Sequence, residues 1–260
     1  MKVSVVIPAL NEEATVADVV RACRADGPAE VLVIDADSQD DTARQASGAG
    51  ARVVNWRDVL PAIPPRAGKG ESLWRGVEAA CGDVVVFVDA DLESAEPGMV
   101  RSLIAPLADP HVQMVRASYR RTFEGKPAGG GRVTELTAKP LLRHFFPELA
   151  DVNQPLGGEY AVRRAAARQV PFVDGYGVES GLLIDFARRF GTDAIAQAHL
   201  SPRVHRNRPL SQLTKMADVV AGTVLARALA ADGRSAEEET LRRFGLEQRP
   251  PLDSLLEGAD

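Results

Sequence analysis

Short apolar runs separated by amphipathic stretches set the strongest constraint on the fold of this chain. Each run is rich in β-branched residues, as the buried strands of a parallel sheet are. The runs cover residues 3–7, 31–34, 52–54 and 84–88. Helical spacing of apolar residues follows the first run from Val16 to Cys23, and further helices are predicted near Asp40 and over 73–80. This alternation predicts an α/β fold with a mainly parallel sheet flanked by helices.

Polar residues follow the ends of three of these runs. Asn11 and Glu12 follow the first, residues 35–37 the second, and Asp89-Ala90-Asp91 the fourth. In an open α/β sheet the ligand crevice lies outside the carboxyl ends of the strands. The pattern therefore predicts a binding site along that edge.

The Asp89-Ala90-Asp91 triplet is the most informative of these ends. Two carboxylates one residue apart suit a hard divalent cation that also contacts a diphosphate, because Mg²⁺ and Mn²⁺ prefer oxygen ligands and keep substrate phosphates in their shell. The alternative is a solvated loop in which Asp91 caps the next helix. The position directly after an apolar strand favours the metal.

Two further segments bear on nucleotide binding. Residues 35–40 superficially resemble a calcium loop, but Asp40 stands where that loop needs glycine. Nucleotide contact and helix capping are the two interpretations that stay open for this segment. Gly68-Lys69-Gly70 is not a P-loop, which needs a hydroxyl residue where Gly70 stands. Lys69 still suits a phosphate because the glycines let backbone approach closely, and a surface lysine in a turn is the alternative.

The second half of the chain has a different pattern. Residues 123–131 are rich in glycine and proline and predict a flexible loop. Residues 129–134 and 203–208 each gather groups that suit a phosphate or carboxylate, with a basic surface turn as the alternative. A helix is predicted over 210–229, and the acidic end, 235–260, is predicted to be peripheral, either partly disordered or used in dimer contacts.

Composition excludes several classes of protein. The 260 residues are 45% hydrophobic and 26% charged, and the net charge of −5 gives no reason to expect nucleic-acid binding. The first apolar run is too short for a signal peptide, and no stretch approaches the ~20 apolar residues that span a bilayer. A cytoplasmic location without membrane contact is therefore predicted, with Cys23 and Cys81 as buried free thiols.

Ordered motifs in both halves resemble one family of sugar-transferring enzymes. Pro8 to Glu13, followed by the acidic triplet, is similar to the nucleotide-binding half of GT-A-fold glycosyltransferases. Further motifs occur in the order found in glucosyl-3-phosphoglycerate synthases, at residues 68–71, 131–136, 154–160, 175–179 and 205–209. The resemblance covers about residues 3–225. Ala36 and Ala90 stand where the family is expected to have serine.

The resemblance implies a Rossmann-like GT-A fold with a smaller C-terminal acceptor-binding part. It divides the chain into a nucleotide-sugar-binding half (1–118), an acceptor-binding and catalytic half (119–229) and an acidic tail or dimer contact (230–260). The implied reaction transfers glucose, with retention, from UDP-glucose to the 2-hydroxyl of 3-phosphoglycerate, in the synthesis of glucosylglycerate and methylglucose lipopolysaccharide. The implied cofactor is Mg²⁺, or Mn²⁺ or Co²⁺, and the implied assembly is a homodimer.

The resemblance also assigns roles to individual residues. The implied donor site consists of Pro8, Ala9, Leu10, Glu12, Ala36, Lys69, Asp89, Ala90 and Glu179. The implied acceptor site consists of Arg132, Val133, Thr134, Tyr176 and Asn207, and the implied metal ligands are Asp91 and His205. Glu179, Asp91 and Arg132 are the implied catalytic residues.

Three alternatives stay open at this point. One is a mannosyl-3-phosphoglycerate synthase that uses GDP-mannose. Another is a sugar-phosphate nucleotidyltransferase, which would also use a parallel sheet, paired carboxylates and a lysine. It normally carries a glycine-rich basic loop after the first strand, where this chain has Ala9 to Glu13. The third, a non-catalytic nucleotide-sugar-binding protein, is disfavoured because motifs for donor and acceptor are both present.

Overall fold

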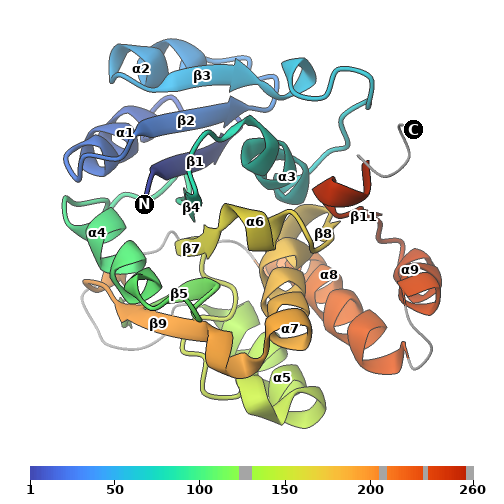
Figure 1. Cartoon of the computed structure of the whole chain (residues 1–260). Helices are drawn as coiled ribbons and strands as arrows, with labels where there is room; N and C mark the ends of the chain where they lie inside the picture. The colour runs from blue at the N-terminus through green and yellow to red at the C-terminus, as the bar shows by residue number, and fades with distance from the viewer. Residues whose placement is uncertain (123–130, 205–209, 231–233, 256–260) are drawn as a thin grey trace.

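A single seven-stranded sheet runs through the molecule in the computed structural model, which describes residues 1–122, 131–204, 210–230 and 234–255 (Figure 1). The strand order is β3-β2-β1-β4-β7-β5-β9. The strands are β1 (Val3–Ala9), β2 (Glu30–Asp35), β3 (Arg52–Asn55), β4 (Val84–Phe87), β5 (Met114–Ser118), β7 (Tyr160–Arg163) and β9 (Ile195–His199). Only β7 runs antiparallel to its neighbours, β4 and β5, among these strands. The prediction of a mainly parallel α/β sheet is confirmed.

Helices cover both faces of this sheet. They are α1 (Val16–Arg24), α2 (Thr42–Gly48), α3 (Lys69–Ala79), α4 (Met99–Ile104), α5 (Lys139–Phe145), α6 (Arg164–Ala167), α7 (Val178–Phe190), α8 (Leu210–Leu229) and α9 (Arg234–Arg243). Two-residue strands complete the fold: β6 (Arg121–Thr122) pairs with β10 (Arg203–Val204), and β8 (Phe172–Val173) pairs with β11 (Gln248–Arg249).

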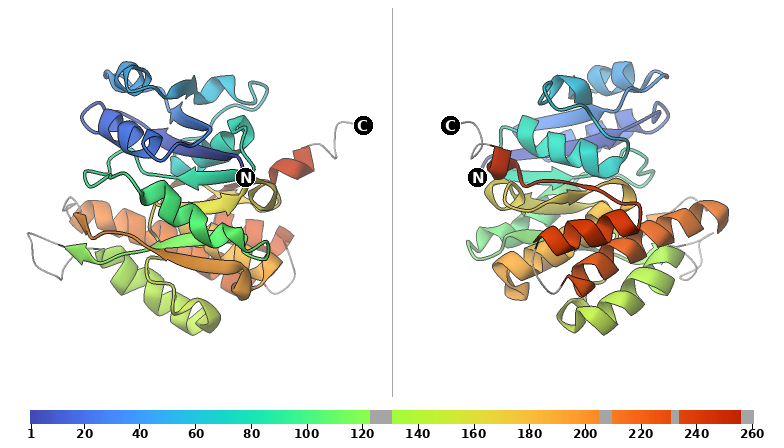
Figure 2. Two further views of the ribbon diagram at one scale, coloured as in Figure 1. Left: turned by 60° about the vertical axis from the view of Figure 1, so that its left-hand side comes forward. Right: turned by 90° about the vertical axis from the view of Figure 1, so that its right-hand side faces the viewer.

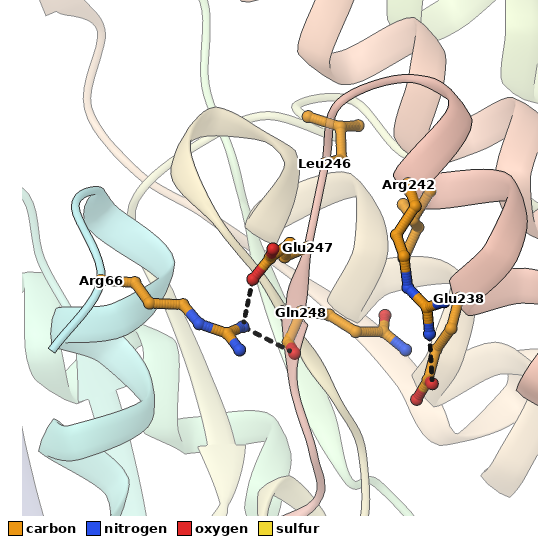
Figure 3. Close-up of a pocket in the computed structure, with 7 residues that line it drawn as sticks. Arg66, Glu238, Arg242, Leu246, Glu247 and Gln248 are labelled. Atoms are coloured by element: carbon orange, nitrogen blue, oxygen red, sulfur yellow. Dashed lines mark hydrogen bonds and ion pairs between the residues drawn. The ribbon is translucent and has the colours of Figure 1, made fainter. Parts of the chain in front are cut away.

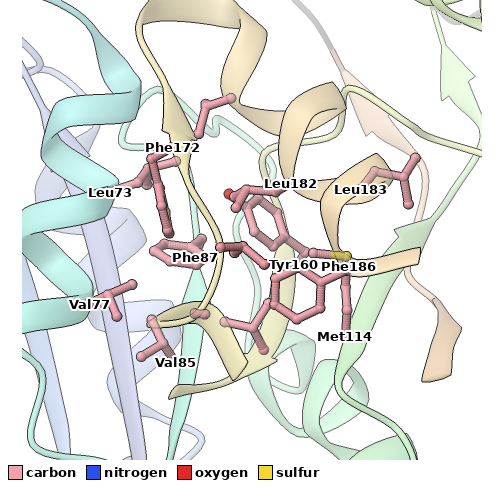
Figure 4. Close-up of a cluster of buried hydrophobic side chains, with 14 of the residues drawn as sticks. Leu73, Val77, Val85, Phe87, Met114, Tyr160, Phe172, Leu182, Leu183 and Phe186 are labelled. Carbon is pink, nitrogen blue, oxygen red and sulfur yellow. The ribbon is translucent and has the colours of Figure 1, made fainter. Parts of the chain in front are cut away.

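The continuous apolar runs of the sequence are explained by burial on both faces. In β4, Val84 and Val86 pack with α1 and α4, whereas Val85 and Phe87 pack in a second cluster with α3 and α7. Figure 4 shows this second cluster, in which Phe87 lies beside Tyr160 with ring centroids 4.8 Å apart. Successive side chains of a strand point to opposite faces, so a strand that is covered on both sides needs apolar residues throughout.

The described residues of the C-terminal segment pack onto the outside of the body and bury several side chains there (Figure 1). Leu241 and Leu246 are buried against α8, and beyond them Arg249 is buried in β11. The acidic composition does not keep α9 away from the body, because Glu237 is 3.1 Å from Arg188 and 3.7 Å from Arg227. In the right-hand view of Figure 2 the segment after α9 runs back towards α3. Residues 256–260 lie outside the described part, and the dimer contact stays a prediction.

Two smaller expectations can also be compared with the structure. Cys23 is buried as predicted, but Cys81 is exposed because it lies in the turn between α3 and β4 rather than inside an element. The sheet takes strands from both sides of the predicted boundary at 118 and 119, so the two predicted halves share one sheet. None of the described helices is long and apolar enough to cross a membrane.

Candidate active site

A cavity of about 350 Å³ lies at the carboxyl ends of β1, β2 and β4. It is lined by every residue of the predicted donor site except Glu179, and also by Asp91 and Tyr176. The structure therefore brings together, along one edge of the sheet, residues that are far apart in the sequence.

The loops after β1 and β2 are tied to each other beside the cavity. The Ser38 hydroxyl oxygen accepts a hydrogen bond from the Asn11 backbone N–H at 3.0 Å, and the Asn11 side-chain oxygen accepts one from the Gln39 N–H at 2.8 Å. The Glu12 backbone N–H donates to the Thr42 hydroxyl at 2.7 Å. These bonds fix the Pro8–Glu12 segment against the start of α2.

Nucleotide contact by residues 35–40 stays a prediction, and the structure places one residue of this segment at the cavity and another beside the start of α2. Ala36 lines the cavity. Asp40 accepts a hydrogen bond from the backbone N–H of Thr42, the first residue of α2, at 3.0 Å, whereas the N-cap residue is Asp41, which makes no side-chain capping hydrogen bond. Asp37 lies 2.6 Å from Arg57 and accepts a hydrogen bond from Asn55, and these hydrogen bonds lower the pKa of Asp37 to about 2. Asp37 therefore holds the end of β3 in place.

Lys69 is the centre of charge in the site. Its Nζ atom lies 2.5 Å from Oδ1 of Asp89 and 2.6 Å from Oε1 of Glu179. Only 18% of the Lys69 side chain and 5% of the Glu179 side chain are exposed. Burial acts to lower the pKa of Lys69, but the charges of Asp89 and Glu179 outweigh it and raise that pKa well above its usual value. Lys69 is therefore a fixed cation, and it links Glu179 to the cavity.

Glycines allow the segments around this lysine to approach one another. A Cβ atom on Gly158 would lie 2.1 Å from Oδ2 of Asp89, and one on Gly70 would lie 1.9 Å from the carbonyl oxygen of Val173. Only glycine can occupy such positions without moving its neighbours. The motifs at 68–71 and 154–160 thus have a steric function: the first lets α3 approach β8, and the second closes over Asp89.

The predicted acceptor residues are only partly placed near the cavity. Tyr176 lines it, on the short helix Gly175–Gly177. Arg132, Val133 and Thr134 lie at the start of a π-helical turn, Thr134–Ala138, and are not among the lining residues. Val133 is buried in an apolar cluster with Ala138 and Val220. Asn207 lies outside the described residues.

The carboxylates of the triplet fit a hard divalent cation. Asp89 and Asp91 both line the cavity, and Mg²⁺-like cations are commonly held by one or two carboxylates together with substrate phosphates. In the part of the chain that the structure describes, no three His, Cys, Asp or Glu side chains form a metal-binding group. This pair therefore suits a cation that is shared with a bound diphosphate. The second predicted ligand, His205, lies outside the described residues.

Comparison with known proteins agrees with this geometry. A family model described as glycosyl transferase family 2 matches residues 4–166. A glucosyl-3-phosphoglycerate synthase of Mycolicibacterium paratuberculosis is 44% identical over 277 residues, covering 97% of this chain and 84% of the relative. Another from Mycolicibacterium smegmatis is 45% identical, covering 97% of this chain and 89% of the relative. This chain belongs to glycosyltransferase family 2.

Solved structures extend the likeness to three dimensions. The crystal structure of the Mycobacterium tuberculosis glucosyl-3-phosphoglycerate synthase in complex with Mn²⁺, UDP-glucose and phosphoglyceric acid matches with a TM-score of 0.85 at 42% identity, covering 98% of this chain and 91% of the other. The complex of that enzyme with Mn²⁺, UDP and glucosyl-3-phosphoglycerate matches with a TM-score of 0.84. The resemblance read from the motifs and the prediction of a GT-A fold are both confirmed.

Sequence reasoning did not name several residues that line the cavity of this family 2 glycosyltransferase. They are Trp56, Ala67 and Ser72, whereas Gly68 and Gly175 were named as parts of motifs without a role at the cavity. Trp56 directly follows β3, so its position after a parallel strand was a usable signal. Ser72 lies one helical turn beyond Lys69, and therefore faces the same side of α3.

Proposed function

We propose that this chain transfers glucose from UDP-glucose to the 2-hydroxyl of 3-phosphoglycerate and releases UDP. The observation that carries the proposal is Lys69, held between Asp89 and Glu179 in a cavity at the strand ends. Relatives at 44% and 45% identity are glucosyl-3-phosphoglycerate synthases. A structural neighbour binds Mn²⁺, UDP-glucose and phosphoglyceric acid.

The donor occupies the cavity in this proposal. The uridine lies against the wall formed by Pro8, Ala9, Leu10 and Ala36, with Glu12 nearby, because these residues line the side of the cavity formed by β1 and β2. The diphosphate lies towards Lys69, whose charge is fixed. Glu179, which contacts Lys69, then lies next to the transferred sugar.

The cation and the acceptor complete the proposed site. Asp91 and His205 would hold Mg²⁺, Mn²⁺ or Co²⁺, with Asp89 and Ala90 facing the nucleotide. A bound divalent cation neutralises charge that develops on a diphosphate leaving group. Arg132 and Thr134 would hold phosphoglycerate with Asn207, Tyr176 and the backbone of Val133, since a guanidinium and hydroxyl groups suit a phosphate and a carboxylate.

Front-face attack accounts for retention without a covalent intermediate. The acceptor 2-oxygen forms a bond to the anomeric carbon as the bond from that carbon to the phosphate oxygen breaks, and the hydroxyl proton passes to the departing phosphate. This chain contributes position and charge, because Lys69 and Arg132 hold the two reactants in place. A covalent route would need a carboxylate nucleophile, and Glu179 is the candidate for it. Near-normal turnover by Glu179→Gln excludes that route.

One experiment tests the proposed reaction. Purified protein is incubated with 3-phosphoglycerate, Mg²⁺ and, separately, UDP-glucose, GDP-mannose or ADP-glucose, and the product and its anomer are identified by NMR. We expect α-glucosyl-3-phosphoglycerate from UDP-glucose. Product from GDP-mannose alone would replace glucose by mannose in the proposal, and no product from any donor would overturn it.

A second experiment tests the metal assignment. Asp91→Asn should lower metal-dependent turnover about 10²-fold or more, because the variant loses a charged oxygen ligand. Turnover equal to that of the unchanged protein in saturating Mg²⁺ would refute the assignment. The homodimer and the cytoplasmic location stay predictions.

A further inference from the structure

A buried ion pair joins the C-terminal strand β11 to the first turn of α3. Nε of Arg249 lies 2.6 Å from Oε2 of Glu71, and Nη2 of Arg249 lies 3.0 Å from Oε1. Glu71 is 0% exposed and Arg249 is 6% exposed. The two residues are 178 positions apart in the sequence. A charge this deeply buried requires its partner, since a lone buried charge is strongly destabilising.

The same arginine also holds the loop that leads into α3. Nη2 of Arg249 donates a hydrogen bond to the Pro64 carbonyl oxygen at 2.6 Å. Trp74 of α3 lies under the Arg249 guanidinium, 5.2 Å from it, and donates to the Pro250 carbonyl oxygen at 2.9 Å. The segment that supplies Ala67, Gly68 and Lys69 to the cavity is therefore fixed at both ends by contacts to residues 249 and 250.

The strand that carries Arg249 is also attached to a second segment that lines the cavity, at Gly175 and Tyr176. β11 pairs with β8, and the Asp174 backbone N–H donates to the Glu247 carbonyl oxygen at 3.0 Å, directly before Gly175 and Tyr176. Figure 3 shows Arg66 reaching across to this strand, where its Nη1 atom lies 3.2 Å from both Oε2 of Glu247 and the Gln248 carbonyl oxygen. Residues 247–250, here termed the C-terminal clasp, thus contact residues that flank both segments.

We propose that Arg249 is a positioning residue for the nucleotide-sugar site. The C-terminal clasp holds the segment at residues 67–69 against the segment at residues 175–176, where a Cβ atom on Gly68 would lie 2.7 Å from the backbone nitrogen of Gly175. Glu71 and Lys69 share the first turn of α3, so a displacement of Glu71 moves the cation that lies at the diphosphate. This assignment rests on the proposed function for the identity of the ligand, and it concerns how well the cavity is formed before a ligand arrives.

Three variants separate positioning from simple stabilisation. Arg249→Met removes the guanidinium, and Arg249→Lys keeps the charge but loses the two-point contact with Glu71. Asp253→Asn is the matched control, because Asp253 anchors the chain just beyond the clasp through Arg168 at 2.8 Å rather than through Glu71. Each variant is compared with the unchanged protein by calorimetric titration with UDP and Mg²⁺, by separate titration with 3-phosphoglycerate, and by thermal unfolding.

We expect Arg249→Met to weaken UDP binding about tenfold, because small displacements of positioning groups have effects of this size or larger. Binding of 3-phosphoglycerate should stay within about twofold, since Arg132 and Thr134 lie on an element that the clasp does not hold. Arg249→Lys should be intermediate, and Asp253→Asn should leave both affinities unchanged. Equal weakening of both ligands, or unchanged UDP binding with a lowered unfolding temperature, would overturn the positioning role.

Two further outcomes are decided by the same measurements. If Arg249→Met does not fold, Arg249→Lys supplies the comparison, and unchanged UDP affinity in that variant then contradicts the proposal. If the unchanged protein binds UDP but forms no product with any donor, the proposed reaction fails, whereas the UDP titrations still decide the role of Arg249.

Discussion

Lys69 and Glu71 stand two residues apart in the first turn of α3, and their surroundings differ sharply. Lys69 lies between the acids Asp89 and Glu179 at the cavity, with 18% of its side chain exposed. Glu71 lies between the cations Arg75 and Arg249, with none of its side chain exposed. On the cavity side the protein charges can exchange their partners for a ligand, whereas on the clasp side they are closed to solvent. One helical turn therefore carries a binding charge on one side and a structural charge on the other.

On the clasp side two arginines share one glutamate, and backbone carbonyl oxygens accept further hydrogen bonds from both guanidinium groups. Arg75 donates to the Trp56 carbonyl oxygen at 3.0 Å and to the Ile63 carbonyl oxygen at 2.5 Å, and Arg249 donates to the Pro64 carbonyl oxygen. These bonds hold the loop that carries Trp56 and Ala67 into the cavity. The buried charges thus shape the site without entering it.

The largest effect is expected from Lys69→Met. The variant loses the fixed cation at the diphosphate, so kcat/KM for UDP-glucose should fall about 10²- to 10³-fold. Its stability should also fall, because Glu179, with 5% of its side chain exposed, loses its countercharge, so the kinetics are measured at a temperature at which thermal unfolding shows the variant to be folded. The control is Lys215→Met, at an exposed lysine of α8. Steady-state kinetics check the prediction, and equal activity of the two variants would place the diphosphate elsewhere.

Glu71→Gln should act on stability. Removing one partner of a buried ion pair leaves Arg249 without its countercharge and should lower the free energy of unfolding by about 3 kcal/mol. Glu135→Gln is the control, because Glu135 also pairs with a cation four residues along, Lys139, but is exposed. That variant should lose only about 0.5 kcal/mol. Urea unfolding measures both, and similar losses would show that burial does not matter here.

The residues on the two sides of α3 differ in whether a local sequence pattern identifies their partners. This difference determines how much of each side could be predicted from the sequence. The acids after β1, β2 and β4 follow apolar runs, so a local pattern predicts the edge where Asp89, Asp91 and Glu12 meet. The helix over Leu210–Leu229 was likewise predicted because its apolar spacing is local. The family motifs then extended the prediction to Lys69 and Glu179, which a local pattern does not connect.

Other features depend on partners that no local pattern identifies. The partner of Glu71 is Arg249, 178 residues away, in an acidic segment that was predicted only to be peripheral, either partly disordered or used in dimer contacts. The direction of β7 was not predicted either, since a four-residue strand carries no mark of its orientation. Both features are set by tertiary contacts and were found only in the structure.

Glu30 begins β2 and so lies at the end of the sheet away from the cavity, where it is a second example of an acid with a structural role. Glu30 accepts hydrogen bonds from the Ser4 hydroxyl at 2.6 Å and the Cys81 backbone N–H at 2.7 Å. Burial acts to raise the pKa of Glu30, but the hydrogen bonds from Cys81, Ser4 and Arg52 outweigh it and lower that pKa from 4.5 to about 2.

The stability that Glu30 contributes is therefore fully present above its unfolded pKa and is lost as the pH falls from 4.5 through about 2. Glu30→Gln should lower the free energy of unfolding at pH 7 by about 2 kcal/mol, and this difference should shrink below pH 4.5. Urea unfolding at pH 7 and at a pH near the folded pKa checks this, and kcat should not change. A difference that is independent of pH would exclude the carboxylate as its cause.

The smallest effect is expected from Gly158→Ala. The added Cβ atom would lie 2.1 Å from Oδ2 of Asp89, so the carboxylate must move at the cavity and kcat/KM should fall about tenfold. Gly48→Ala is the control, because a Cβ atom there meets nothing within 4 Å. Kinetics of both variants, with thermal unfolding as a check on folding, test the contact. Equal kinetics would mean that Asp89 can shift without consequence.

The central place of β7 has a consequence for how the chain can be cut or synthesised. Residues 160–163 lie between β4 and β5, so β5 joins the first four strands of the sheet only after the chain has passed residue 163. A fragment that ends at residue 118 would leave Val84 to Phe87 as an open, wholly apolar sheet edge, which is a site for aggregation. The nascent first half must therefore wait for the second before its edge is closed, and a fragment intended to isolate nucleotide binding needs to extend through β7.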